Sequence, residues 1–316
     1  MVVIVAVAVG LVATPTAAWI ARQVGLLDYP GPLKVQNLPV PYLGGLAVLT
    51  AMSAGVAIAR PVWLVPLALA LALGTIDDAR SLPPRVRLVG EGCVGLVAGA
   101  LVPSGIAQPW AALATAAIVV LLINAVNLID GLDALAVGVA VVSAIGFAIA
   151  LDGDDRTVAL ALAGALAAFL VYNRPPARIY LGDGGSYLLG TALAVLLVGA
   201  WRPDRDLALS IGSLLLVAFP VAEVVCAVLR RARARVPLFS GDRSHLYDQL
   251  VHRGWSAAGT SLVCAATQAV LCALGLLAGR AATPVALAVV AATALAFLAG
   301  AAAGGFLSPA SPRSTS

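Results

Sequence analysis

Charged residues are scarce in this sequence. Asp, Glu, Lys and Arg make up 11% of the 316 residues, whereas hydrophobic residues make up 61%. Soluble globular domains carry about 25% charged residues, so this composition excludes an ordinary soluble protein. The mean hydropathy is +1.02, and apolar runs of about 17 to 25 residues are long enough to cross a bilayer as helices. The sequence therefore predicts a polytopic membrane protein.

Cysteine is also rare, and its placement excludes two kinds of structural site. The four cysteines occur singly in apolar stretches, without the paired spacing of a zinc site. Cys264 and Cys272 are eight residues apart on one expected helix, which separates them by about 12 Å along its axis, too far for a disulfide. We expect the cysteines to be small packing residues.

The apolar runs predict an all-α fold: a bundle of about eleven transmembrane helices. One membrane domain would cover residues 1–306, with its active site formed by cytoplasmic loops, and a short polar tail would follow over 307–316. The first run lacks the basic start of a signal peptide, so we expect it to remain as a helix of the mature protein. No internal repeat is visible. The expected spans are 1–21, 43–59, 61–76, 86–103, 109–127, 134–151, 157–173, 185–201, 207–229, 257–279 and 282–306.

The basic residues predict the orientation. With the loop after the first span in the cytoplasm, fourteen of the nineteen Lys and Arg residues fall on the cytoplasmic side and five outside. The positive-inside rule then predicts an outer N-terminus and a cytoplasmic C-terminus. The isoelectric point of about 9.1 follows from this topology, and we expect no nucleic-acid partner.

On that topology the aspartates divide between the two faces. Those outside lie in charged turns such as LDGDDR and RPDRD, and we expect them to be solvated loop residues: Asp152, Asp154, Asp155, Asp204 and Asp206. Those inside lie beside glycine, proline and asparagine at helix ends: Asp28, Asp77, Asp78, Asp130, Asp133, Asp183, Asp242 and Asp248. We therefore predict a site on the cytoplasmic face.

The stretch from Leu121 to Val137 carries the clearest polar pattern. Four side chains follow at three-residue spacing: Asn124, Asn127, Asp130 and Asp133. Residues three apart on a helix are neighbours, and carboxylates beside a bilayer are a functional hypothesis by default. The alternative is a polar turn broken by Gly131.

Two further acidic motifs close or open spans. Asp77 and Asp78 end the third span, where the partial negative charge of a helix C-terminus disfavours acids; an aspartate pair answered by Arg80 is the alternative. Asp183 lies among glycines before the eighth span, which would let backbone amides and a carboxylate approach a phosphate or its metal. Alternatively, Asp183 or Ser186 is a simple N-cap.

The loop from Arg230 to Ser256 holds both histidines of the chain. His245 and His252 are seven residues apart and would share one face of a short helix. The basic start of the loop either sets topology or binds anionic lipid headgroups. Glu223 would form a snorkelling pair with Arg230, and the role of Glu91 stays open.

Acidic ligands without cysteine suit a hard cation such as Mg²⁺, which takes few carboxylates together with substrate phosphates. A metal can neutralise the charge that develops in a phosphoryl transfer while a carboxylate orients or deprotonates the attacking oxygen. At a membrane surface, such a site suits a soluble nucleotide-activated donor and a lipid-phosphate acceptor.

Five stretches resemble the polyprenyl-phosphate N-acetylhexosamine-1-phosphate transferases. That family includes phospho-N-acetylmuramoyl-pentapeptide transferase and the enzymes that begin O-antigen, teichoic acid and arabinogalactan assembly. The resemblance covers residues 25–256 in the family's order. Its motifs are VPYLGGLAV (40–48), GTIDDAR (74–80), NAVNLIDGLDALA (124–136), YNRPPARIYLGDGGSYLLG (172–190) and PLFSGDRSHLYDQLVHRGWS (237–256).

The resemblance implies transfer of a sugar-1-phosphate from a UDP-sugar to a polyprenyl phosphate such as undecaprenyl phosphate, with release of UMP. It implies Mg²⁺ as the cofactor, with Mn²⁺ as the alternative, and a site on the cytoplasmic face of a bacterial plasma membrane. A homodimer is also implied, although no residue pattern indicates one.

Together with the patterns above, the resemblance assigns a role to each polar residue. The catalytic residues would be Asp77, Asp78 and Asp183, and the metal ligands Asp78, Asp130 and Asp183. The substrate-binding residues would be Lys34, Asn124, Asn127, Asp130, Asp133, Asn173, Asp242, Arg243 and His245.

The chain departs from the family at three places. Residues 245–248 read HLYD where the family commonly has HxHH, Asn37 stands where a histidine often occurs, and Glu223 replaces a common aspartate. The form of this loop favours the simple UDP-N-acetylhexosamine branch, with the muramoyl-pentapeptide branch as the alternative. A transporter or flippase is the alternative of another class, although its charged site would lie nearer the bilayer midplane. A catalytically inactive relative is a further alternative.

Overall fold

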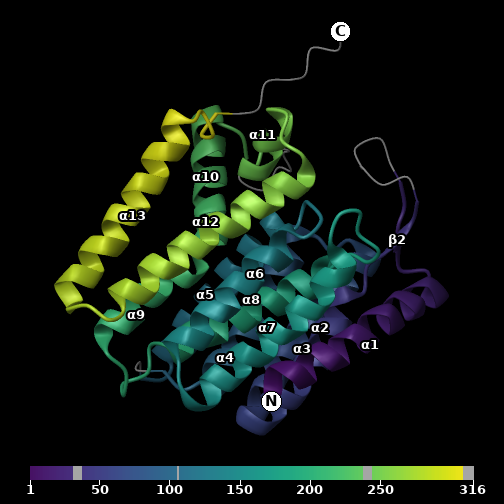
Figure 1. Ribbon diagram of the computed structural model, residues 1–316, viewed down its shortest axis with the longest axis horizontal. Helices are drawn as coiled ribbons and strands as arrows, with labels where there is room; N and C mark the ends of the chain where they lie inside the picture. Colours follow the sequence, from purple (N-terminus) through teal and green to yellow (C-terminus); the bar gives the residue numbers. More distant parts are fainter. Residues whose placement is uncertain (31–37, 105–106, 238–243, 309–316) are drawn as a thin grey trace.

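The computed structural model describes residues 1–30, 38–104, 107–237 and 244–308. In these residues the chain is almost wholly helical and forms one bundle (Figure 1). Eight of the described helical segments are long and apolar enough to cross a membrane, and α2 and α6 are shorter apolar helices. The predicted all-α, multi-pass membrane fold is therefore confirmed, while the number of spans and their orientation stay predictions.

The helices follow one another through short connections. In chain order the elements are α1 (Val2–Val24), β1 (Leu27–Asp28), β2 (Val40–Pro41), α2 (Gly44–Ala59), η1 (Pro61–Trp63), α3 (Leu64–Arg80), α4 (Pro84–Leu101), α5 (Trp110–Ile129), α6 (Leu135–Ala150), α7 (Gly153–Asn173), α8 (Gly182–Gly199), α9 (Leu207–Ser213), η2 (Leu214–Val217), α10 (Ala218–Ala234), α11 (Leu246–His252), α12 (Ala257–Ala278) and α13 (Thr283–Ala303). The strands β1 and β2 form a two-stranded antiparallel sheet.

Helix α8 is the central element of the bundle. Its residues from Gly184 to Gly199 are all buried, and it contacts α2, α3 and α5. A Cβ atom at Gly190 would lie 2.5 Å from the backbone of Ile123 in α5. Small residues allow such close helix contacts in membranes, so α8 is held tightly and its first turn has a fixed position.

The ninth predicted span is not one continuous helix. It consists of α9, the short 3₁₀ helix η2 and α10. Pro220 near the start of α10 has no N–H, and its ring displaces the carbonyl four residues earlier. The segment Leu207–Ala234 is still one candidate membrane span, in agreement with the expected span over 207–229. Helices α3 and α8 extend the expected spans to include Asp77, Asp78 and Asp183.

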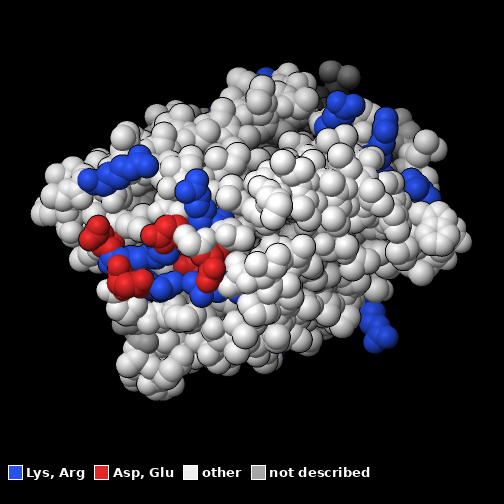
Figure 2. Space-filling model, turned by 60° about the horizontal axis from the view of Figure 1, so that its bottom comes forward, with Lys and Arg blue, Asp and Glu red and all other residues white. Residues whose placement is uncertain are grey.

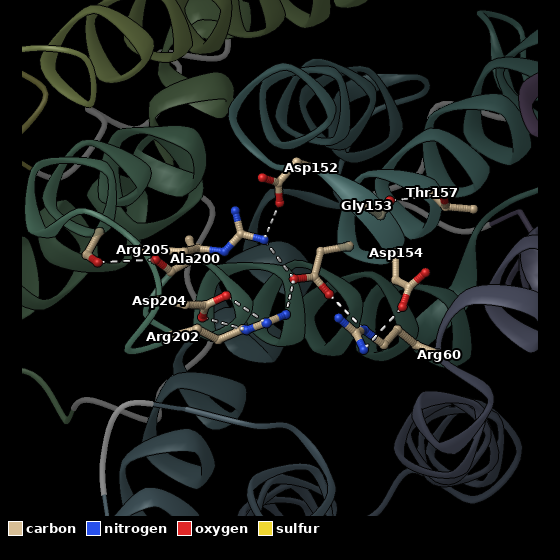
Figure 3. Close-up of polar contacts among 11 residues, drawn as sticks. Arg60, Asp152, Gly153, Asp154, Thr157, Ala200, Arg202, Asp204 and Arg205 are labelled. Atoms are coloured by element: carbon tan, nitrogen blue, oxygen red, sulfur yellow. Dashed lines mark hydrogen bonds and ion pairs between the residues drawn. The ribbon is translucent and has the colours of Figure 1, made fainter.

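The prediction that the aspartates of the LDGDDR and RPDRD turns are solvated is wrong for Asp155. Its side chain is 1% exposed and forms ion pairs with Arg60 at 2.9 Å, Arg202 at 3.3 Å and Arg205 at 3.1 Å. These four residues are the Asp155 cluster, drawn in Figure 3. Acidic and basic side chains also adjoin in one patch of the mostly uncharged surface in Figure 2. The cluster joins the α2–η1 junction, α7 and the α8–α9 connection.

Candidate active site

Asp78 joins the end of α3 to the start of α8. Its Oδ1 accepts a hydrogen bond from the N–H of Asp183 at 2.9 Å, and its Oδ2 accepts one from the N–H of Gly184 at 3.0 Å. The first N–H groups of a helix have no partner within it, so Asp78 satisfies them from another helix. Gly182 has a φ of 75° at this junction. The N-cap of α8 is Leu181, without a side-chain bond, so neither Asp183 nor Ser186 is the N-cap.

The carboxylate of Asp183 is held from α5. Asn127 Nδ2 donates to Asp183 Oδ1 at 2.6 Å and to Ser186 Oγ at 3.1 Å. The bond from Asn127 fixes the direction of the Asp183 carboxylate and engages only its Oδ1. Asn127, Asp78 and Asp183, which lie far apart in the sequence, are therefore brought together as the polar pattern predicted.

Asp77 is buried and is paired by a residue that the sequence patterns did not single out. Arg87 Nε lies 2.9 Å from Asp77 Oδ2, and the Tyr187 hydroxyl donates to the same oxygen at 2.7 Å. Arg87 Nη2 also donates to Asn127 Oδ1 at 3.4 Å. The aspartate pair is thus answered by Arg87 of α4 rather than by Arg80. The sequence patterns indicate no role for Arg87 beyond the count of cytoplasmic basic residues; the signal for its role is its place three residues after Pro84, at the start of α4.

The end of α5 leaves Asp130 open to a ligand. Asp130 is the C-cap of α5, and no hydrogen bond or ion pair to its carboxylate occurs in the described part of the chain. Burial raises the pKa of Asp130 well above its usual range, and the nearby charges of Asp183 and Asp78 raise it further. A cation beside these carboxylates would reverse that effect.

Asp133 and Asn173 brace the loop between α5 and α6. Asp133 Oδ2 accepts from the N–H of Ala177 at 2.9 Å, and burial raises the pKa of Asp133 while this bond lowers it. Asn173 is buried; its Oδ1 accepts from the N–H of Ala134 at 3.0 Å, and its Nδ2 donates to Ile179 O at 3.0 Å. Both side chains hold backbone in place, and their predicted substrate contacts stay predictions.

Asn124 lies one helical turn before Asn127 and has a different partner. Its Nδ2 donates to Glu91 Oε2 at 2.6 Å and to Val120 O at 2.8 Å. Glu91 is completely buried. The predicted polar stripe therefore divides: Asn124 pairs with α4, and only Asn127 reaches the carboxylate of Asp183.

His245 is held by Glu223, a second residue that the sequence patterns did not assign to the site. Its Nδ1 lies 3.0 Å from Glu223 Oε1, and Glu223 also accepts from the N–H of Leu246 at 3.0 Å and pairs with Arg230 at 3.3 Å. Glu223 and Arg230 are both buried, so the pair does not snorkel. The predicted common face of His245 and His252 is wrong, because His245 precedes α11 and is buried whereas His252, at its end, is exposed.

Tyr247 connects this region to the Asp130 loop. Its ring stacks on His245 with a centroid separation of 5.5 Å, and its hydroxyl contacts Gly131, where an added Cβ would overlap it. The predicted substrate-binding residues Lys34, Asp242 and Arg243 lie outside the described residues.

Comparison with known proteins shows the family of this chain. A model of glycosyl transferase family 4 matches residues 61–200, from η1 to the end of α8. A probable undecaprenyl-phosphate N-acetylglucosaminyl 1-phosphate transferase of Bacillus subtilis (strain 168) is 30% identical over 274 residues, which cover 78% of this chain and 75% of the relative. The chain belongs to glycosyl transferase family 4.

Two other relatives of this family 4 chain have related names. The decaprenyl-phosphate N-acetylglucosaminephosphotransferase of Mycobacterium tuberculosis (strain ATCC 25618 / H37Rv) is 29% identical over 299 residues, with 77% of this chain and 73% of the relative covered. The undecaprenyl-phosphate alpha-N-acetylglucosaminyl 1-phosphate transferase of Escherichia coli (strain K12) is 24% identical over 286 residues, with 82% and 78% covered.

The chemistry of the carboxylates in this family 4 chain suits a magnesium ion that takes few protein ligands. Among the described residues, no group of three His, Cys, Asp or Glu side chains is placed to hold a metal ion by itself. The Asp130 carboxylate has no bond partner in the described residues, and the Asp183 carboxylate uses one oxygen for Asn127. Mg²⁺ commonly takes one or two carboxylates and completes its octahedron with water and phosphate oxygens, so this donor set suits it.

Proposed function

We propose that the chain transfers N-acetylglucosamine-1-phosphate, or a closely related N-acetylhexosamine-1-phosphate, from a UDP-sugar to a polyprenyl phosphate. A phosphate oxygen of the lipid forms a bond to the sugar-bearing phosphorus of the donor. The bond from that phosphorus to the bridging oxygen breaks, and UMP leaves with this oxygen. The product is a polyprenyl-diphospho-sugar, the first membrane intermediate of a bacterial surface glycan.

The carboxylates have different roles in the proposed reaction. Asp78 holds the first turn of α8 through two backbone N–H groups, so Asp183 faces the reacting phosphates from a rigid position. Asp130 and Asp183 would hold Mg²⁺, with Mn²⁺ as the alternative, and Asp78 would support them. The metal supplies charge neutralisation to the transferring phosphoryl group. Asp133 and His245 would contact the donor at the other side of the Asp130 loop.

The proposal rests most heavily on one observation: Asp78, Asn127 and Asp183 from three separate helices are joined at one end of the bundle. A carrier would need its charged site nearer the midplane of the bilayer. The names of the three relatives favour N-acetylglucosamine over the muramoyl-pentapeptide alternative. From the orientation that the basic residues predict, we propose that the site lies at the cytoplasmic face of the bacterial plasma membrane.

The test offers the purified protein undecaprenyl phosphate and a panel of UDP-sugars with Mg²⁺, and identifies the lipid product by mass and UMP by chromatography. We expect product with UDP-N-acetylglucosamine, loss of activity with EDTA and recovery on adding Mg²⁺ or Mn²⁺. A carrier or an inactive relative would release no UMP from any donor. Full activity in EDTA would remove the metal from the proposal.

Arg87 offers a sharper test of the site. We expect Arg87→Gln to lower the transfer rate by about 100-fold, because it removes the cation that pairs with the buried Asp77 and the donor to Asn127. Arg80→Gln is the matched control, since Arg80 is an exposed arginine at the end of α3, and its rate should stay near that of the wild type. Equal rates for the two variants would show that Arg87 has no part in the reaction.

A further inference from the structure

Gln268 is a polar residue inside a membrane span that the proposed reaction does not use. It lies on α12 and is completely buried. Polar side chains at such positions are costly and mark a function or an internal partner. All four hydrogen-bond contacts recorded for its side chain are internal, and three of them lie at the break between η2 and α10.

The break leaves backbone groups that Gln268 satisfies. In a continuous helix Phe219 would donate to Leu215 O, and Leu216 O would have no donor because Pro220 lacks an N–H. Here Phe219 N–H donates to Gln268 Oε1 at 2.9 Å. Gln268 Nε2 donates to Leu216 O at 2.8 Å and Leu215 O at 3.3 Å, and it contacts Cys272 Sγ at 3.2 Å. One amide thus supplies both the missing donor and a new acceptor.

The break sets the direction of α10, which carries Glu223 one turn later. Glu223 accepts from the N–H of Leu246 at the start of α11 and contacts His245 Nδ1. From α11, Tyr247 reaches Gly131, beside Asp130. A continuous series of contacts therefore runs from Gln268 to the Asp130 loop.

We propose that Gln268 is a positioning residue of the transfer reaction, which completes the broken helix so that α10 and α11 place His245 and Tyr247 against the Asp130 loop. The inference rests on the proposed function. Gln268 contacts neither the proposed metal-binding carboxylates nor the α3–α8 joint, which is the pair of bonds from the N–H groups of Asp183 and Gly184 to Asp78. Its effect therefore reaches the reaction through α10 and α11.

The geometry predicts for which of the two substrates the kinetic constants change when Gln268 is substituted. Among the described residues, the hydrogen bonds and ion pairs of the α3–α8 joint involve no residue of α10 or α11, whereas the Asp130 loop contacts Tyr247. Gln268→Leu keeps the volume but removes the amide. We expect it to lower kcat/KM for UDP-N-acetylglucosamine by about 30-fold while KM for undecaprenyl phosphate changes by less than about 2-fold.

Two further variants separate positioning from a general loss of structure. Thr267→Val is the matched control, because within the described part of the chain the Thr267 hydroxyl bonds only to Val263 O of its own helix. Pro220→Ala restores an N–H that can donate to Leu216 O. We expect Gln268→Leu to cost less than about 3-fold when it is combined with Pro220→Ala, a non-additivity that marks a shared interaction.

The inference is overturned if Gln268→Leu matches Thr267→Val, or if the losses of Gln268→Leu and Pro220→Ala multiply. If the wild-type protein transfers no sugar phosphate, the proposed function fails, and hydrogen exchange of the peptide over 246–252 then decides the placement of α11. Lost protection in Gln268→Leu but not in Thr267→Val supports the placement, and unchanged protection in both refutes it.

Discussion

Asp183→Asn is expected to lower sugar-phosphate transfer by about 1,000-fold. Asparagine has the same shape and can still accept the bond from Asn127, which reaches Asp183 Oδ1 at 2.6 Å. The N–H that binds Asp78 is also unchanged. What the variant loses is the negative charge, and with it the predicted contribution to the metal.

The test compares the transfer rate and the thermal stability of the Asp183→Asn variant, which separates a catalytic role of Asp183 from a structural one. If Asp183 only held Asn127 and α8 in place, the asparagine variant would keep both bonds and most of the rate. Asp204→Asn is the matched control, because Asp204 is 62% exposed and pairs with Arg202 at the opposite end of the bundle. Purified wild-type and variant proteins would be compared by transfer rate and by thermal midpoint in the same detergent. A rate for Asp183→Asn within about 10-fold of the control would contradict the metal assignment.

The sequence could predict that Asp77, Asp78, Asn127 and Asp183 gather at one end of the bundle, because each lies where an apolar run starts or stops. Short connections between helices place alternate helix ends on the same side, so the position of each motif along its span fixes its end of the bundle. The partners of these groups could not be predicted in the same way. Arg87 reaches Asp77 across the α3–α4 connection, and that contact depends on how the two helices rotate.

The broken helix shows a second limit of the sequence. Pro220 lies where α10 leaves the line of α9 and η2, yet Pro15 lies inside the uninterrupted helix α1. A proline removes one hydrogen bond in both cases. A neighbouring helix satisfies the freed carbonyl in both cases: Tyr172 of α7 donates to Leu11 O at 2.9 Å, and Gln268 of α12 donates to Leu216 O at 2.8 Å. The outcome differs because Gln268 also accepts from the N–H of Phe219, which in a continuous helix would bond to Leu215 O. Only the tertiary arrangement distinguishes the two prolines.

Asp155→Asn is expected to destabilise the folded protein by about 3–5 kcal/mol, because it removes the single carboxylate shared by three arginines. Asp155 is 1% exposed, and Arg205, one of its partners, is 8% exposed. Each arginine would keep one exposed partner, Asp154, Asp204 or Asp152, but the buried negative charge between the three guanidinium groups would be lost. The substitution leaves the carboxylates of the candidate active site unchanged.

Asp154→Asn is the control for this prediction, since Asp154 precedes Asp155 in the same turn but is 56% exposed and has one ion pair, to Arg60 at 3.4 Å. An exposed pair contributes about 0–1 kcal/mol, so its unfolding midpoint should stay close to that of the wild type. Denaturant unfolding in detergent, followed by circular dichroism, would measure both variants against the wild type. Well below its midpoint, Asp155→Asn should still transfer sugar phosphate at about the normal rate. Equal midpoints for the two variants would mean that the buried charge of Asp155 contributes nothing to stability. Loss of sugar-phosphate transfer in a folded Asp155→Asn protein would mean that the Asp155 cluster is coupled to the candidate active site at the other end of the bundle.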